Sequence, residues 1–497
     1  MTEGVLERFG EATRAWFTAA FAEPTPAQAG AWSAISAGKH ALVVAPTGSG
    51  KTLAAFLWAL DRLARERVAA PSDPPGPAAG DAPRPTRAAR RAAGDEPGTG
   101  APHRGCRVLY VSPLKALAAD VERNLRTPLA GIRQAAIRLG LPPPDITVAM
   151  RTGDTPAEER RAFVRDPADI LITTPESLFL LLTSASREAL RSVDTVIVDE
   201  VHAIAATKRG AHLALSLERL DALLPRPAQR IGLSATVRPL EEVARFLGGA
   251  APVEVVNPPA HKTIEITVEV PVEDMTRLDE TPADDEHFRG DGPDGPLYGQ
   301  PDGPPLPGSG RQASIWPAVE RRVYELITSH RSTIVFVNSR RLAERLCARL
   351  NEMAAAEWAP AVDLGLGVAG EDQLTTPRPR STRGAGRMPA QIMAQSGAAA
   401  GAPPVIARAH HGSLSQQERK HIEEALKSGT LPAVVATSSL ELGIDMGSVD
   451  LVVQIEAPPS VAAGLQRIGR AGHQVGAVSR GVVFPKHRGD LLACAVT

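Results

Sequence analysis

The stretch Ala45-Pro46-Thr47-Gly48-Ser49-Gly50-Lys51-Thr52 decides how the rest of this 497-residue sequence is interpreted. It follows the apolar run at 41–44 and precedes residues 53–58, which carry apolar side chains at helical spacing. A Gly-rich loop between a strand and a helix is the setting in which a phosphate-binding P-loop forms. Backbone N–H groups of the loop and the N-terminus of the helix would then surround a triphosphate.

Individual residues of this loop have separate predicted roles. Lys51 is predicted to reach the β- and γ-phosphates, and Thr52 to bind Mg²⁺ through its hydroxyl. The rest of the nucleotide site would be formed by Thr47, Gly48, Ser49 and Gly50. Ala45 stands where the motif usually has its first Gly, so the motif needs support from elsewhere in the chain. The alternative is a Gly-rich turn with an exposed Lys.

Length and composition narrow the class of protein. A chain of 497 residues exceeds one ordinary core, so two or more domains are expected. The net charge of −1 means that any nucleic-acid site would be a local groove. Three widely spaced cysteines exclude a disulfide framework and a Cys-rich zinc site, and favour a reducing cytosol. Because no secretory signal and no apolar run of roughly 20 residues is present, we expect a soluble, cytoplasmic protein.

Buried strands alternate with helical patterns through both halves of the sequence. The first half has expected strands at 107–111, 146–149, 170–173, 193–198 and 230–233, and the second half at 333–337, 405–409, 433–436, 449–455 and 481–484. This alternation predicts an α/β fold with mainly parallel sheets, in which ligands bind beyond the carboxyl ends of the strands.

Three segments lack the apolar content that a core requires and are predicted to be disordered insertions or linkers. We predict an N-terminal ATP-binding domain over 1–255 with an insertion at 70–105, an acidic flexible linker over 256–312, and a second α/β domain over 313–497 with an insertion at 353–404. Residues 273–302 contain ten Asp or Glu against two Arg. Their charge would keep this linker away from nucleic acid.

Two acidic residues directly follow the strand that ends at Val198. Asp199 is predicted to hold Mg²⁺ through water, and Glu200 to orient and deprotonate the attacking water. At the end of a later strand, the hydroxyls of Ser234 and Thr236 could bridge this cluster to whatever binds above the sheet. The alternative for the two acids is a helix cap or a solvent-facing pair.

Polar residues outside these motifs have candidate roles as well. Gln28 precedes the P-loop strand, and its amide could pair with the edge of adenine, although a lone Gln is usually a surface residue. Arg467 and Arg470 lie three residues apart at an expected helix start, so both could project from one face. An Arg supplied from outside the P-loop domain stabilises the departing γ-phosphate. The alternative for these two arginines is surface salt bridges.

The order of these motifs resembles that of the superfamily-two helicases. The set consists of Gln28, the P-loop, and residues 113–117, 174–176, 199–202, 234–236, 437–445 and 466–473. Within that superfamily the sequence is similar to the large helicase-related (Lhr) family, as residues 439–447 and the ending Arg470-Ala471-Gly472-His473 indicate. Many relatives have an Arg at the position of His473.

The resemblance implies two tandem RecA-like domains that form an ATP-dependent 3′→5′ translocase on single-stranded DNA. It implies unwinding of duplexes, including RNA–DNA hybrids, and a role in DNA repair. By the same resemblance, ATP and Mg²⁺ are held and used by Lys51, Thr52, Asp199, Glu200, Arg467 and Arg470. Asp445 would link the nucleotide site to the bound nucleic-acid strand. Coupling between the nucleotide site and the nucleic-acid site would involve His202, Ser234 and Thr236. The nucleic-acid backbone would be contacted by Lys115, Thr174, Ser413 and Thr437. Since the family carries winged-helix and further domains, we expect this chain to be a fragment or a truncated product.

Two other functions stay open on the sequence. One is an ATP-gated clamp that binds structured RNA without processive translocation; the tetrad D-E-V-H at 199–202, in place of D-E-A-D, favours translocation without deciding the matter. The other is a small-molecule P-loop kinase or a structural ATPase, which would leave Arg467, Arg470 and the second sheet without a role.

Overall fold

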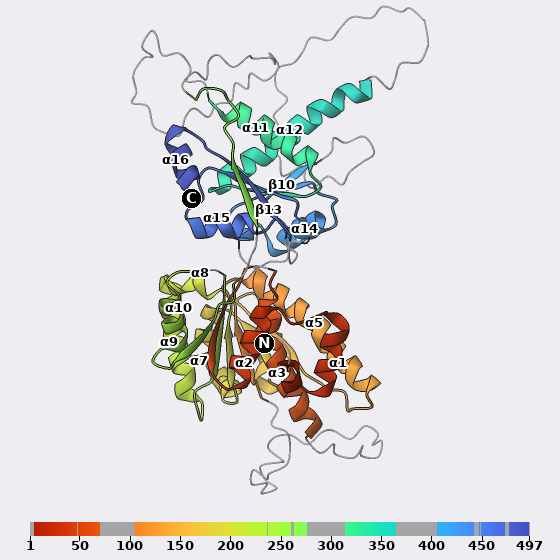
Figure 1. Ribbon diagram of the computed structural model, residues 1–497, viewed down its shortest axis with the longest axis vertical. Helices are drawn as coiled ribbons and strands as arrows, with labels where there is room; N and C mark the ends of the chain where they lie inside the picture. The colour runs from red at the N-terminus through yellow and green to blue at the C-terminus, as the bar shows by residue number, and fades with distance from the viewer. Residues whose placement is uncertain are drawn as a thin grey trace, which may run out of the picture. The chain divides into compact units, whose positions relative to one another are not determined.

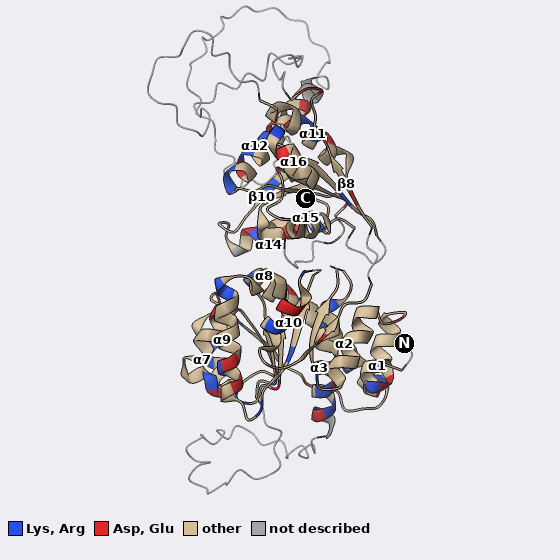
Figure 2. Ribbon diagram, turned by 60° about the vertical axis from the view of Figure 1, so that its left-hand side comes forward, with Lys and Arg blue, Asp and Glu red and all other residues tan. Residues whose placement is uncertain are grey.

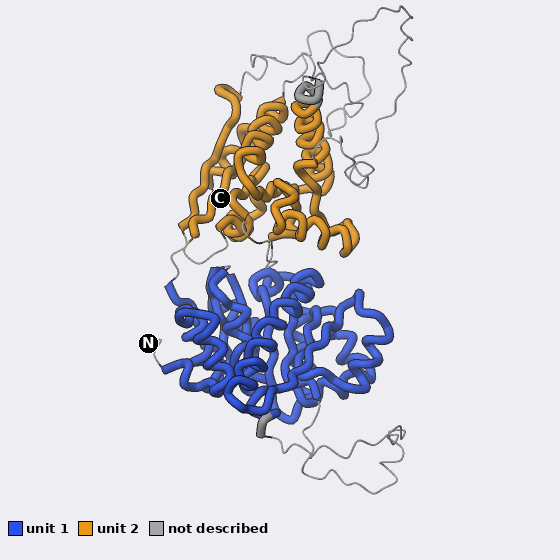
Figure 3. Tube along the Cα trace, turned by 90° about the vertical axis from the view of Figure 1, so that its right-hand side faces the viewer, with its two compact units in different colours: residues 1–261, 442–445 blue, residues 262–441, 446–497 orange. Residues whose placement is uncertain are grey.

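The computed structural model describes residues 4–46, 48–69, 105–235, 237–259, 263–275, 314–363, 405–441, 447, 449–472 and 477–496. The chain forms two compact units, the first spanning Met1–His261 and the second beginning at Lys262 (Figure 3). The described residues leave out most of the two predicted insertions and most of the predicted acidic linker. Three residues with expected roles, Thr47, Thr236 and Asp445, also lie outside the described residues, as does His473.

The first unit is built on a seven-stranded sheet in which neighbouring strands are parallel. The strand order is β3 (Val148–Arg151), β4 (Ile170–Thr173), β2 (Val108–Val111), β5 (Thr195–Val198), β6 (Gln229–Ser234), β1 (His40–Val44) and β7 (Val253–Val256). Successive side chains of a strand point to opposite faces. Val43 therefore packs on one side of the sheet and Leu42 on the other, and both sides are apolar and buried.

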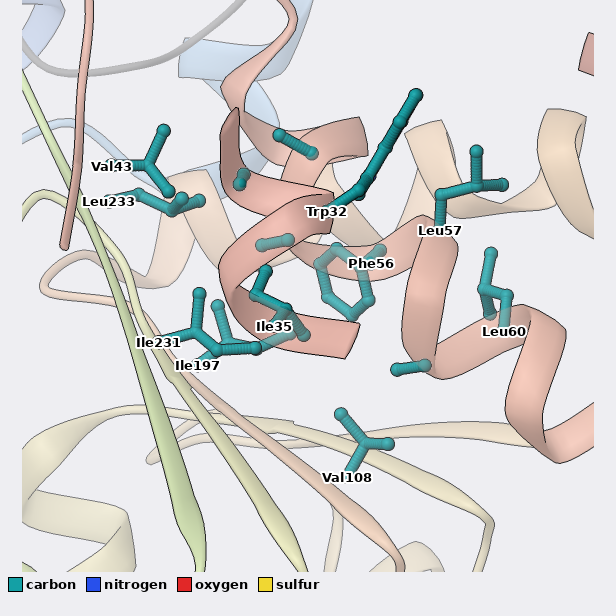
Figure 4. Packing of buried hydrophobic residues seen from close by; sticks show 14 of the residues in the cluster. Trp32, Ile35, Val43, Phe56, Leu57, Leu60, Val108, Ile197, Ile231 and Leu233 are labelled. Atoms are coloured by element: carbon teal, nitrogen blue, oxygen red, sulfur yellow. The ribbon is translucent and has the colours of Figure 1, made fainter. Parts of the chain in front are cut away.

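Helices cover both faces of this sheet (Figure 1). One face packs against α1 (Glu11–Ala20), α2 (Pro26–Ser36), α3 (Lys51–Ala69) and α5 (Lys115–Arg138), and the other against α7 (Pro175–Leu182), α8 (Val201–Ala205), α9 (Lys208–Leu223) and α10 (Leu240–Gly248). Figure 4 shows Trp32 and Phe56 within the first cluster, beside strand residues such as Ile197. Full burial of such a side chain contributes roughly 1.5–3 kcal/mol, so α2 and α3 are anchored on the sheet at the P-loop strand.

The second unit has a six-stranded parallel sheet. Its order is β10 (Ala407–His410), β11 (Ala433–Ala436), β9 (Thr333–Phe336), β12 (Leu451–Ile455), β13 (Ser479–Phe484) and β8 (Ile264–Val268). On one face, α11 (Trp316–Ser329) and α12 (Arg340–Asp363) bury an apolar cluster. On the other face lie α14 (Gln416–Lys427) and α15 (Val461–Ile468), and α16 (Arg488–Val496) packs beside β13 (Figure 1). The predicted fold, two parallel sheets with helices on both faces, is confirmed.

The ends of the predicted domains need correction. Strand β8 lies within the predicted linker at 256–312, and α12 continues to Asp363, inside the insertion predicted from residue 353. Strand β7 was not predicted either. Both unpredicted strands are sheet edges, and each carries one exposed glutamate that pairs with a basic residue, Glu254 with Lys39 and Glu265 with Arg480. A charged residue within so short a strand interrupts its apolar pattern, as is common at sheet edges.

Charged residues of both signs are interspersed on outer helices such as α9 and α3 (Figure 2), in agreement with the net charge of −1. None of the described helices combines the length and the apolar composition that a bilayer crossing requires. Cys106, Cys347 and Cys494 are all buried free thiols.

Candidate functional site

The P-loop lies between β1 and α3, at the carboxyl edge of the first sheet. Gly48 and Gly50 have φ angles of +82° and +77°, in the left-handed region that favours glycine. Ala45 has no positive φ, and its N–H continues the strand pairing by donating to the carbonyl of Ser234 (3.1 Å). The loop therefore needs glycine at 48 and 50 but not at 45, which explains the departure from the usual motif.

Hydrogen bonds close the loop on itself. The Lys51 ammonium donates to the Ala45 carbonyl, so its side chain folds back toward the start of the loop. The Ser49 hydroxyl donates to the carbonyl of Pro46 (2.7 Å), and the Thr25 hydroxyl donates to the carbonyl of Ser49 (3.1 Å). The loop is thereby held against the start of α2, with the N-terminus of α3 beside it.

Gln28 is buried beneath the P-loop. Its Oε1 accepts from the N–H of Thr25 (3.0 Å) in a capping box at the start of α2, and its Nε2 donates to the carbonyl of Gly50 (3.5 Å). A Cβ at residue 50 would lie 2.5 Å from that Nε2, so any larger residue at 50 would displace the Gln28 amide from its hydrogen bond. These bonds use one of the two N–H groups and one lone pair of the Gln28 amide, so the other N–H group and lone pair are left for a ligand. The contact of Gln28 with adenine stays a prediction.

Asp199 follows β5 and is fixed by two hydrogen bonds. The Tyr110 hydroxyl, from neighbouring β2, donates to Oδ2, and the N–H of Glu200 donates to Oδ1 (2.9 Å). The ring of Tyr110 is stacked on Phe56 of α3, with centroids 4.9 Å apart. The carboxylate is thus tied to the P-loop helix, and each oxygen keeps a lone pair for a cation.

His202 links the ends of two strands. The N–H of Ala235 donates to His202 Nδ1 (3.2 Å), which also lies 3.2 Å from the hydroxyl of Ser234 at the end of β6. Because Nδ1 accepts from a backbone N–H, Nε2 carries the ring proton and faces Glu200 Oε2 at 3.5 Å. Burial lowers the pKa of His202, although Glu200 opposes this, so the neutral ring is favoured.

Glu200 has an unusual backbone. Its φ of +44° and ψ of +47° are left-handed, which is rare for a residue with a side chain. Such conformations are strained and persist where the surrounding structure enforces them, often at functional sites. The alternative of a solvent-facing acidic pair is excluded, because Asp199 and Glu200 are each only 6% exposed.

The residues at this edge fit a nucleotide and a divalent cation. Burial raises the pKa of Asp199 and the Glu200 carboxylate raises it further, whereas Lys51 lowers it. A raised pKa means that the surroundings of the Asp199 carboxylate do not fully compensate its negative charge. A divalent cation bound beside it would supply the missing positive charge. Asp199 supplies carboxylate oxygens, and Thr52 carries a hydroxyl in the first turn of α3. Oxygen ligands are those that Mg²⁺ prefers and usually combines with substrate phosphates and water.

The second unit contains a buried network around Arg467. Its Nε and Nη2 donate to Oε2 of Glu441 (3.1 and 2.9 Å). Its Nη1 donates to the side-chain oxygens of Asn338 (3.1 Å) and Gln454 (3.0 Å). The guanidinium carbon also lies 5.3 Å from the ring centroid of Phe336. Four of the five N–H groups of an arginine are therefore occupied inside the second unit.

Arg470 converges on the same acidic residue. Its Nη2 donates to the backbone carbonyl of Glu441 (2.8 Å). Arg467 and Arg470 are 3% and 2% exposed, which excludes the surface salt bridges considered above. The expected helix start is wrong: Arg467 lies in the last turn of α15, and Arg470 follows its C-cap residue, Gly469.

Two of the residues predicted to contact nucleic acid lie in the first unit. Lys115 forms a 2.6 Å salt bridge with Asp154, and both side chains are about half exposed. Surface pairs of this kind contribute roughly 0–1 kcal/mol, so a phosphate could replace the carboxylate at little cost. Thr174 is buried and caps α7, accepting from the N–H of Ser177 (3.4 Å). The hydroxyl of Thr174 is therefore engaged in a hydrogen bond within the first unit.

The other two lie in the second unit. Ser413 is exposed, and its hydroxyl accepts from Arg340. Thr437 is half-buried directly after β11, and its N–H donates to the carbonyl of His410 (3.2 Å). Contact of these residues with nucleic acid stays a prediction.

Sequence reasoning assigned no role to four residues that hold the predicted ones in place. They are Tyr110, Asn338, Glu441 and Gln454. Tyr110 gave the clearest signal, because a Tyr within an otherwise aliphatic buried strand needs a partner for its hydroxyl. Gln454 gave a similar signal within β12.

Comparison with protein families identifies two domains. Residues 25–244 match the DEAD/DEAH box helicase family, and residues 393–474 match the helicase conserved C-terminal domain.

Individual proteins agree with these domains. The chain is 58% identical over 492 residues to the Lhr helicase/probable uracil glycosylase of Mycolicibacterium smegmatis, and 50% identical over 491 residues to the Lhr helicase/uracil glycosylase of Escherichia coli. These alignments cover 99% and 98% of this chain but only 27% and 28% of those proteins. A structure of Mycobacterium smegmatis helicase Lhr bound to ssDNA and AMP-PNP matches with a TM-score of 0.72 and 55% identity, over 99% of this chain and 50% of that one.

Replacing Tyr110 by Phe tests whether its hydroxyl orients Asp199. The substitution keeps the ring stacked on Phe56 but removes the hydrogen bond to the carboxylate. Loss of a partner that orients a metal ligand typically weakens metal affinity roughly 10- to 100-fold. We expect the Mg²⁺ concentration for half-maximal binding of a fluorescent ATP analogue to rise by about 10-fold or more.

Tyr324→Phe is the matched control, because the Tyr324 hydroxyl donates to a carboxylate, that of Glu357 (2.7 Å), away from this site. It should leave the Mg²⁺ titration unchanged. An unchanged Mg²⁺ midpoint in Tyr110→Phe would show that the hydroxyl has no part in the site.

Proposed function

This chain belongs to the Lhr-type DEAD/DEAH box helicases, and we propose that it hydrolyses ATP to move along single-stranded DNA. One observation carries the proposal: a P-loop whose Lys51 folds back toward Ala45 shares one sheet edge with the buried pair Asp199 and Glu200. The complex of the M. smegmatis relative with ssDNA and AMP-PNP supports the choice of ligands.

Binding begins at the P-loop. Backbone N–H groups around Gly48 and Gly50, with the N-terminus of α3, would surround the phosphates. Lys51 would exchange the Ala45 carbonyl for phosphate oxygens, which offer it a full negative charge. Thr52 and Asp199 would hold Mg²⁺, which when bound offsets the charge on the β- and γ-phosphate oxygens.

Glu200 would act as the base. Its left-handed backbone sets the direction of a carboxylate that is removed from bulk water. This carboxylate would take the proton of the attacking water, while His202 Nε2–H, 3.5 Å from Oε2, steadies the charge. Through Nδ1, the same ring contacts Ser234 and Ala235, so a change at Glu200 would reach the end of β6. A role for Thr236 in this coupling is part of the proposal.

The second unit would supply the arginines. We propose that Arg467 and Arg470 stabilise the γ-phosphate as it leaves, and that Lys115, Thr174, Ser413 and Thr437 lie along the nucleic-acid backbone. Translocation in the 3′→5′ direction, unwinding of RNA–DNA hybrids, a role in DNA repair and a cytoplasmic location belong to the same proposal and rest on the family resemblance.

The proposal is tested by ATP turnover with and without single-stranded DNA or RNA, and by strand displacement on duplexes with a 3′ or a 5′ tail. We expect stimulation by DNA and displacement that requires the 3′ tail. Stimulation by RNA without any tail preference would favour the ATP-gated clamp instead. Turnover that ignores every nucleic acid would favour a structural ATPase.

Substitutions at the nucleotide site should separate binding from chemistry. Glu200→Gln keeps the size of the side chain but removes the base, so ATP should bind while turnover collapses. Lys51→Ala removes a phosphate contact and should weaken ATP binding itself. Equilibrium binding of a fluorescent ATP analogue, measured beside turnover, distinguishes the two. Equal loss of affinity in both variants would contradict the assigned roles.

Arg470→Ala tests the contribution of the second unit. Removal of an arginine that acts on the γ-phosphate should lower turnover on the order of 10³-fold while ATP binding persists. Arg470→Lys should restore little, because an ammonium cannot reproduce the planar contact of a guanidinium. Arg480→Ala, which removes an exposed arginine of the same unit, is the control. Near-normal, DNA-stimulated turnover in Arg470→Ala would mean that this arginine takes no part in hydrolysis.

A further inference from the structure

Glu441 accepts hydrogen bonds from both arginines that the proposed function places at the γ-phosphate of ATP. Its carboxylate Oε2 accepts from Nε and Nη2 of Arg467, and its backbone carbonyl accepts from Nη2 of Arg470. The Glu441 side chain is itself only 15% exposed. One residue therefore fixes two guanidinium groups, each through a different atom.

The carboxylate of Glu441 compensates the positive charge of the buried Arg467 side chain. Among the described residues, Glu441 supplies the carboxylate within ion-pair distance of Arg467, while Asn338 and Gln454 supply neutral amide oxygens. A buried ion pair is stable only while both partners are present, since either one alone is an uncompensated charge. Without the carboxylate, the Arg467 guanidinium would have to move toward water.

The turn that follows β11 sets the position of Glu441. The N–H of Glu441 donates to the carbonyl of Ser438 (3.2 Å) across the short 3₁₀ helix η5 (Ser438–Leu440). The same turn begins with Thr437, a predicted nucleic-acid contact, whose N–H is bonded to the end of β10. A shift of this turn would move the carboxylate and the carbonyl of Glu441 together, and both arginines with them.

We propose that Glu441 is a positioning residue: it orients Arg467 and Arg470 and transmits nucleic-acid binding at the turn after β11 to them. This inference rests on the proposed function, because it takes the arginines to act on ATP. Glu441 acts only through the two guanidinium groups, whose orientation decides whether they reach the γ-phosphate.

Two other roles for Glu441 lead to different results. If Glu441 held the arginines back from ATP, neutralising it would raise ATP turnover in the absence of DNA. If Glu441 only stabilised the fold, neutralising it would lower the unfolding temperature and leave kcat of the folded protein unchanged. A positioning role predicts a fall in kcat and in DNA stimulation, with the affinity for ATP retained.

The test is Glu441→Gln, which keeps the side-chain shape and removes the charge. Misplacement of a reacting group by about 1 Å can cost on the order of 10²-fold in rate, and we expect a loss of that order in DNA-stimulated kcat. KM for ATP should change by no more than about threefold, since the P-loop is untouched. Higher turnover without DNA, or unchanged kcat, would overturn the proposal.

Glu320→Gln is the matched control. Glu320 pairs with Arg349 at 3.2 Å in the same unit, and its side chain is 13% exposed, close to the value for Glu441. This variant loses a comparable carboxylate–arginine pair away from the network, so its kcat should equal that of the unmodified chain. Thermal unfolding of both variants separates loss of folded protein from loss of rate.

A spectroscopic measurement keeps this inference separate from the proposed function. In protein labelled with ¹⁵N-arginine, Arg467→Lys and Arg470→Lys assign the two side-chain N–H signals, and Glu441→Gln should shift both. If both signals shift but the unmodified chain shows no DNA-stimulated turnover, the proposed function fails and the positioning role stands. If turnover is stimulated by DNA but the signals stay in place, the positioning role fails.

Discussion

The parallel pairing of β6 with β1 on one side and with β5 on the other is the constraint on which the nucleotide site depends. Val44 lies opposite Ser234, and Val198 lies opposite Gly232, so the three strands end at nearly the same level. The P-loop, the acidic pair and Ser234 therefore emerge at one edge, although Ala45 and Ser234 lie 189 positions apart in the sequence. Apolar packing on both faces of the sheet keeps this register fixed.

The carboxyl edge of the second sheet also surrounds a buried charge, here the positive charge of Arg467. Asn338 follows β9, Gln454 lies near the end of β12, and Glu441 follows β11, so their side chains gather at the carboxyl edge of that sheet around Arg467. In the first unit, burial leaves Asp199 short of positive charge. In the second unit, the buried cation already has a carboxylate partner. Each edge is thus built around a buried charge, and the two charges have opposite sign.

Local sequence patterns were enough to predict the fold, to place Asp199 and Glu200 directly after a buried strand, and to place Lys51 where the P-loop meets its helix. They could not reveal Tyr110 or Asn338, whose partners lie 89 and 129 residues away along the chain. Such contacts exist only once the sheets have formed. Strand β8 was not predicted for a different reason: it is an edge strand in which apolar residues alternate with Glu265 and Thr267, so its apolar pattern is weak.

Under the proposed mechanism, the left-handed backbone at Glu200 sets the requirement for a carboxylate at this position against the stability of the fold. A conformation of this kind costs on the order of 1–3 kcal/mol for a residue with a side chain, and almost nothing for glycine. Selection for heat resistance alone, or a design procedure that scores only the folded state, would therefore favour glycine at position 200 and discard the carboxylate. In the proposed mechanism, Glu200 therefore supplies the base at a cost in folding stability.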